Sequence, residues 1–121
     1  MSSAWLATGS IAAAIGVAMG AFGAHALRTR VPADLQAVFE TGVRYHLVHA
    51  LALVAVAWAA DRWPGRWVTI SGWSFLVGIV VFSGSLYLLS ITGVRWLGAV
   101  TPIGGLAFLL GWTALAVAAL R

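Results

Sequence analysis

The amino-acid sequence predicts an all-α integral membrane bundle of four transmembrane helices, in a single domain over residues 1–121. Hydrophobic residues make up 62% of the chain and charged residues only 8%, whereas soluble domains average about 45–50% apolar and about 25% charged residues. A soluble fold of this length exposes too large a share of its surface to hide so many apolar side chains. The few charged residues also divide the chain into apolar segments long enough to cross a bilayer.

Four segments are expected to span the membrane. Ala4 to Leu27 contains no Asp, Glu, Lys or Arg, and its roughly 24 residues cross a hydrocarbon core of about 30 Å. A cleaved signal peptide is disfavoured, because its apolar region is shorter and follows a basic start. The fourth helix begins at Thr101, with Pro102 in its first turn, or it begins earlier and is kinked by the proline. The predicted spans are residues 4–27, 43–60, 68–91 and 97–120.

The connection between the first two spans is the most polar part of the chain. Pro32 suits the first turn of a helix, and residues 33–41 are expected to form an amphipathic extension that continues into the second span, through to Ala60. Glu40 and Arg44 are four residues apart and therefore share one helix face. They form an ion pair at the mouth of a cavity, or a solvated surface pair worth a few tenths of a kcal/mol.

The basic net charge of +4 does not indicate nucleic-acid binding. The seven basic residues are all arginine and are spread along the chain, whereas nucleic-acid binding needs a clustered basic face. Arginine at helix ends, reaching toward lipid phosphates, is the better interpretation. The arginines are nearly balanced between the two sides of the membrane, so the positive-inside rule assigns no orientation.

Small residues recur at a spacing of four in the first span, and a weaker series occurs in the fourth. Such a stripe lets helices approach one another closely in lipid. It indicates packing within one bundle or, alternatively, the seam of a homodimer. The glycines expected to serve helix packing are Gly16, Gly20, Gly23, Gly104 and Gly105.

The three histidines are the strongest chemical lead. His25 ends the first span, and His46 and His49 begin the second, so all three are expected on one side of the membrane, with polar groups gathered where these spans meet. Imidazole binds metal or haem, or relays protons; the alternative is an interhelical hydrogen bond or an interfacial anchor. The full set of candidate polar or ligand-binding residues is His25, Arg44, Tyr45, His46, His49, Ser83, Ser85 and Tyr87.

Neither a metal centre nor a catalytic set is complete. The chain has no cysteine, and no cluster of carboxylates accompanies the candidate metal ligands His25 and His49. A nucleophilic serine such as Ser83 or Ser85 needs a base and an orienting group, and no spacing argues for them. The glycine-rich segments lack the phosphate-loop lysine. We therefore predict no enzymatic activity and no cofactor.

Four stretches together resemble a known family, in the right order and over nearly the whole chain. The stretches are Gly20–Leu27, Phe39–Ala50, Phe82–Tyr87 and Thr101–Trp112. They resemble the YgdD-like family of small bacterial inner-membrane proteins, a domain of unknown function to which transmembrane protein 256 is similar. The resemblance implies four transmembrane helices in the bacterial plasma (inner) membrane and no established activity. In that family the position of His46 is often glutamine, so a site of three imidazoles is not shared.

Three functional classes stay open. The first is a non-enzymatic membrane protein that binds lipid or a partner and supports membrane or complex integrity; the lack of a catalytic set favours it. The second is an oligomeric small transporter or channel subunit, with a path lined by His25, Arg44, Tyr45, His49 and Ser85. The third is a haem, metal or quinone binder in which His25 faces His49. The expected partners are the lipid bilayer and further copies or other membrane proteins, with no nucleic acid.

Overall fold

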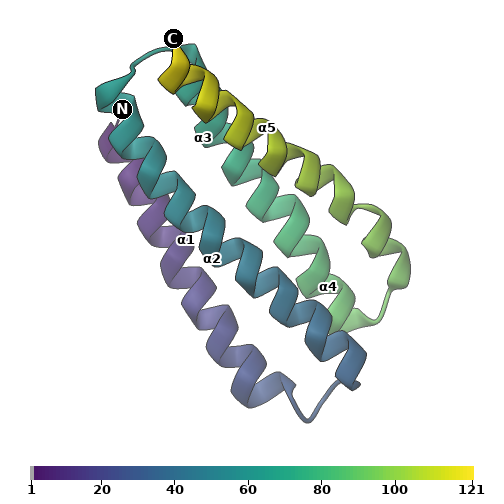
Figure 1. Ribbon diagram of the computed structural model, residues 1–121. Coiled ribbons are helices and arrows are strands. Elements are labelled where there is room, and N and C mark those ends of the chain that lie inside the picture. Colours follow the sequence, from purple (N-terminus) through teal and green to yellow (C-terminus); the bar gives the residue numbers. More distant parts are fainter. Residues whose placement is uncertain (1) are drawn as a thin grey trace.

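The computed structural model describes residues 2–121, and helices account for nearly all of them (Figure 1). Four segments are long and apolar enough to cross a membrane, which confirms the predicted all-α bundle of four spans. The elements, in chain order, are α1 (Ser2–Phe22), the π-helix η1 (Gly23–Leu27), α2 (Ala33–Arg62), α3 (Arg66–Gly78), the π-helix η2 (Ile79–Ser83), α4 (Gly84–Thr92), the 3-10 helix η3 (Arg95–Ala99) and α5 (Thr101–Leu120).

The second span is one unbroken helix of 30 residues. It begins directly after Pro32, so the predicted amphipathic extension does continue into the span. At 1.5 Å per residue α2 is about 45 Å long, which exceeds a hydrocarbon core of about 30 Å. Its polar first turns therefore extend toward the headgroup level, and residues near position 47 lie halfway along it.

The third span combines α3, η2 and α4 without a break from Arg66 to Thr92. The π-helix in its centre adds one residue to the turn, which changes the direction of the side chains that follow it. The helix ends at Gly93, whose φ of +72° is the left-handed conformation that favours glycine at a helix end.

The structure decides where the fourth helix begins. A short 3-10 helix, η3, follows the turn after α4, and α5 starts at Thr101 with Pro102 in its first turn. The α-helix therefore begins at Thr101, and Pro102 does not kink a longer α-helix. Thr101 does not cap the helix with its side chain, however. Its hydroxyl instead lies 2.6 Å from the Ser85 hydroxyl of α4.

The four spans do not pack equally against one another. α1 packs along α2 and α5 along α3, while α2 also contacts α3, η2 and α4 (Figure 1). The pair formed by α2 and the third span is thus the centre, with α1 and α5 on its two flanks. α1 begins and α5 ends at the same end of the bundle, as an even number of spans requires.

The glycines of the first span, which consists of α1 and η1, face α2. A side chain added at Gly16 would meet Leu47, one at Gly20 would meet Val43, and one at Gly23 would meet the Phe39 ring. In α5, a side chain added at Gly104 would collide with the backbone of Phe82, whereas one added at Gly105 would come only within 3.9 Å of the Phe82 ring. The glycine stripe of the first span therefore serves packing within one bundle, because the facing helix is already in place.

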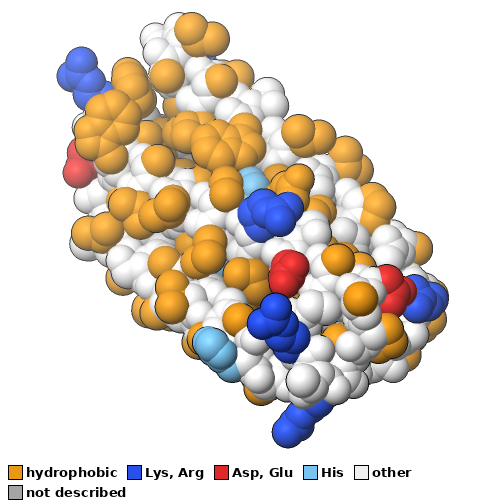
Figure 2. Space-filling model, turned by 60° about the horizontal axis from the view of Figure 1, so that its bottom comes forward, with side chains coloured by type: hydrophobic (Ala, Val, Ile, Leu, Met, Phe, Trp, Pro, Cys, Tyr) orange, Lys and Arg blue, Asp and Glu red, His pale blue; other side chains and the backbone are white. Residues whose placement is uncertain are grey.

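The outer surface is apolar. Leu51, Val80 and Leu106 each expose 65% or more of their side chains, as expected where lipid replaces water as the solvent. Figure 2, in which the end with the α1–α2 connection comes forward, shows most of the charged side chains in view near that end. Among the described residues the salt bridge found is Arg95 with Asp34, at 3.1 Å, and not the predicted Glu40–Arg44 pair.

Candidate functional site

His46 joins three helices through both ring nitrogens. Its Nε2 lies 2.8 Å from the carbonyl oxygen of Ala12 in α1, and its Nδ1 lies 2.8 Å from the Tyr87 hydroxyl of α4. A carbonyl only accepts, so Nε2 carries a proton, and in the neutral imidazole Nδ1 then accepts from the Tyr87 O–H. Both ring nitrogens of the buried imidazole are therefore hydrogen-bonded.

His49 joins two helices in the opposite tautomer. Its Nδ1 lies 2.7 Å from the carbonyl oxygen of Tyr45, one turn earlier in α2, and so donates to it. Its Nε2 accepts from the indole N–H of Trp112 in α5, at 3.1 Å. The ring also stacks on Phe108, with 3.5 Å between ring centres. The N–H donor, the acceptor nitrogen and a face of the His49 ring therefore each contact another group of the bundle.

The serine hydroxyls act in the same way between other helices. Ser83 donates to the carbonyl of Gly42 in α2, and Ser71 in α3 donates to the carbonyl of Gly111 in α5, each at 2.7 Å. Ser85 bonds Thr101 across α4 and α5. Hydrogen bonds of this kind are a common means of helix association in lipid, where the hydrophobic effect between helices is absent.

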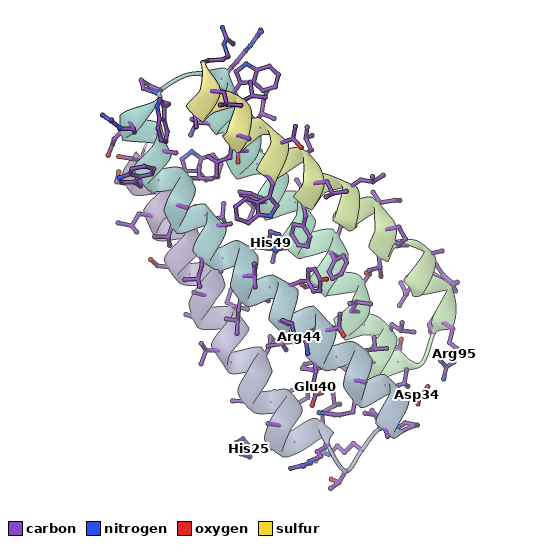
Figure 3. All side chains as sticks on the ribbon, in the orientation of Figure 1. His25, Asp34, Glu40, Arg44, His49 and Arg95 are labelled. Atoms are coloured by element: carbon purple, nitrogen blue, oxygen red, sulfur yellow. The ribbon has the colours of Figure 1, made fainter. Side chains whose placement is uncertain are left out.

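The structure does not bring the three histidines together. His25 is exposed on η1, near the end of the bundle, whereas His49 lies near the middle of α2 (Figure 3). His46 and His49 lie roughly 20 and 24 Å from the start of a helix about 45 Å long. The three imidazoles therefore do not form one site: His46 meets the first span at Ala12, while at the end of that span the Gln36 amide donates to the Gly23 carbonyl. The reason is that the first turns of α2 already pack beside the end of the first span, where Phe39 faces Gly23.

Two grooves open sideways from the bundle, toward the lipid. The first, with a volume of about 440 Å³, lies between α1 and the third span and has His46 and Tyr87 in its lining. The second, of about 610 Å³, lies between α2 and α5 and is lined by aromatic side chains together with Tyr45 and His49. Both linings are mostly apolar, and the hydrogen-bonded imidazoles of His46 and His49 are among their few polar groups.

The residues predicted to line a transport path are distributed over several places. Tyr45 and His49 share the second groove, Ser85 is bonded to Thr101, and Arg44 is exposed on α2. Within residues 2–121 no group of three or more metal-ligating side chains is assembled. The pairing of His25 with His49 that a haem or metal site required is not formed.

Trp112 is the residue that the sequence analysis missed. Although it lies in one of the stretches that carry the family resemblance, it was not named as a site residue. A signal was available, because an indole N–H placed inside an apolar span requires a hydrogen-bond acceptor. His49 is that acceptor.

Replacing Trp112 with phenylalanine is expected to lower the free energy of unfolding by about 1 kcal/mol, since an aromatic ring remains but the pyrrole part of the indole is lost together with its N–H donor to His49. Unfolding by sodium dodecyl sulfate in mixed micelles, followed by circular dichroism, measures the change. Trp96→Phe is the matched control, because Trp96 is 68% exposed. Equal losses in the two variants would show that the His49 bond contributes nothing measurable.

Comparison with known proteins identifies relatives over nearly the whole chain. A family model described as a protein of unknown function, DUF423, matches residues 19–105. The UPF0382 membrane protein YwdK of Bacillus subtilis is 49% identical, over 93% of each chain. The UPF0382 inner membrane protein YgdD of Escherichia coli K12 is 40% identical, over 93% of this chain and 86% of its own. No solved structure matches this chain.

Proposed function

This chain belongs to the DUF423 family of proteins of unknown function, and on that premise we propose that it is a non-enzymatic membrane protein that supports the membrane or a membrane complex through contacts of its outer helix faces. The four candidate spans, and relatives named as membrane and inner membrane proteins, agree with the predicted multi-pass location in the bacterial plasma (inner) membrane.

The hydrogen bonds of the buried His46 and His49 imidazoles support this proposal. A general base or a proton relay must exchange a proton with its substrate, and a metal ligand must offer a lone pair. In His46 and His49 every ring nitrogen is instead hydrogen-bonded within the bundle: three of the four bond a neighbouring helix, and His49 Nδ1 bonds the Tyr45 carbonyl of α2 itself. These residues therefore hold the helices in register, and the surfaces left for function are the outer faces and the two apolar grooves.

Transport is the competing function, and a flux measurement separates the two. The purified protein is reconstituted into vesicles of phosphatidylethanolamine and phosphatidylglycerol that contain a pH-sensitive dye, and a potassium diffusion potential is imposed. Proton entry is expected to equal that of protein-free vesicles. Entry above that level that His49→Gln removes would overturn the proposal and favour a proton path at the second groove.

A deletion strain gives the positive test in cells. Loss of the protein is expected to raise the uptake of a membrane-impermeant dye. Expression of either the wild type or His49→Gln, at matched levels, is expected to restore the barrier, because contact does not need the imidazole. Restoration by the wild type alone would indicate that His49 performs chemistry, and an unchanged barrier in the deletion strain would contradict a role in membrane integrity.

A further inference from the structure

One face of α2 is covered by no other helix of the bundle. Its exposed positions recur at alternating spacings of four and three residues, so they form one continuous stripe along the helix. Leu51 and Trp58 on this face are 66% and 61% exposed. We define this exposed face of α2 by Arg44, Val48, Leu51, Ala55, Trp58 and Arg62.

Two charges stand at the end of the exposed face that is nearer the α1–α2 connection. Glu40 and Arg44 are both exposed (Figure 3). Beside them runs the end of the first span, where Gly23 in η1 faces Phe39 and Gly20 faces Val43. Both charges belong to the candidate membrane span Ala33–Arg62. Ionisable side chains within membrane spans are costly and are usually paired.

Neither charge is neutralised within the described part of the chain. The salt bridge found among residues 2–121 is Asp34 with Arg95. The carboxylate of Glu40 accepts a hydrogen bond from the neutral Gln36 amide at 3.4 Å. Arg44 donates no hydrogen bond to any described residue at comparable distance. Both charges are thus available to a charged partner outside the chain.

We propose that the exposed face of α2 is the interface of a homodimer in the membrane, in which Arg44 of each copy pairs with Glu40 of the partner subunit. A two-fold axis along the membrane normal makes every contact reciprocal, so one arrangement forms both ion pairs. Helical side chains lean toward the amino terminus of their helix. The guanidinium of Arg44 thus reaches the level of the partner's Glu40 across a parallel helix.

A second copy fits these charges better than a lipid does. A lipid phosphate would neutralise Arg44 but would be repelled by Glu40, one turn away. At this end of the face a second copy supplies one charge of each sign, and the Glu40 and Arg44 charges of the two copies sum to zero. Beyond them, Val48, Leu51 and Ala55 provide an apolar contact surface in which Ala55 permits close approach of the two helices.

Site-directed cross-linking in native membranes tests the interface. The chain has no cysteine, so Leu51→Cys and Leu109→Cys each introduce the single thiol of the protein. Leu109 is the control because it is 64% exposed but lies on α5. A short bis-maleimide is expected to join Leu51→Cys into a species of twice the monomer mass and to leave Leu109→Cys monomeric.

Charge reversal tests the pairing. Glu40→Arg and Arg44→Glu, each combined with Leu51→Cys, place like charges across the interface and are expected to reduce the dimer at least about tenfold. When the two variants are co-expressed with tags of different size, opposite charges meet again, and the mixed dimer is expected to recover. Recovery also shows that each variant is folded.

Three outcomes would overturn the proposal. Equal cross-linking of Leu51→Cys and Leu109→Cys would mean random collision of monomers in the bilayer. A product of Leu51→Cys with a different protein would assign the face to a foreign membrane partner. A dimer that tolerates both single reversals would remove the Arg44–Glu40 pairing.

Discussion

Gly104→Ala is expected to destabilise the protein by at least about 2 kcal/mol, because overpacking against an immobile neighbour costs roughly 1–3 kcal/mol and occasionally more. A methyl group at this position would collide with the backbone nitrogen and Cα of Phe82 in η2. Side-chain rotation cannot relieve a backbone collision, so α5 must move away from the third span. Detergent unfolding followed by circular dichroism gives the free energy directly.

Gly105→Ala is the matched control for this prediction. It lies one residue further along the same helix, and its added methyl group would come only within 3.9 Å of the Phe82 ring, an ordinary contact. Alanine is also favoured over glycine within a helix by roughly 0.5–1 kcal/mol. Gly105→Ala is thus expected to leave stability unchanged or slightly raised. If Gly104→Ala behaved in the same way, the close approach of α5 to η2 would be incorrect.

His46→Leu is expected to lower the free energy of unfolding by about 1–3 kcal/mol. The substitution fills a similar volume but removes both interhelical hydrogen bonds, to the Ala12 carbonyl and to the Tyr87 hydroxyl. Interhelical hydrogen bonds in membranes average about 0.6 kcal/mol and reach about 1.7. The hydroxyl of Tyr87 would also lose its acceptor, which adds to the cost.

His46→Gln separates hydrogen bonding from charge and ring chemistry. A carboxamide donates through nitrogen and accepts through oxygen, so it can replace both contacts, and we expect stability within about 1 kcal/mol of the wild type. This substitution also matches the residue that the family resemblance implies at this position. A double-mutant cycle with Tyr87→Phe should give a coupling energy of about 1 kcal/mol for histidine. Equal losses for His46→Leu and His46→Gln would indicate that shape alone matters here.

The fold was predictable because its main determinant is local. Each span is an uninterrupted apolar segment of sufficient length, and backbone groups in lipid must be satisfied within the segment, which leaves the helix as the only open choice. Breakers such as Pro64 with Gly65 mark connections in the same local way, and the structure has a helix boundary there. The continuous α2, from Ala33 onward, follows from the same reasoning.

The arrangement of the polar groups was decided by tertiary structure. Spacing along one helix could identify His46 and His49 as neighbours, but it could not show that Ala12, Tyr87 and Trp112 meet them from three other helices. The depth of His49 depends on how far α2 extends beside the first span, and the groove lining depends on which helices touch.

By itself, then, the sequence determined the number of spans, the helical class and the places where the chain turns. These are set by apolar length and by backbone chemistry within single segments. Only the tertiary structure decided that the imidazoles bond helices together, that the α1 glycines face α2, and that Glu40 and Arg44 stand unneutralised by the described chain on an exposed face. Helix partners in lipid are chosen by close packing and hydrogen bonds between distant segments, which no local pattern contains.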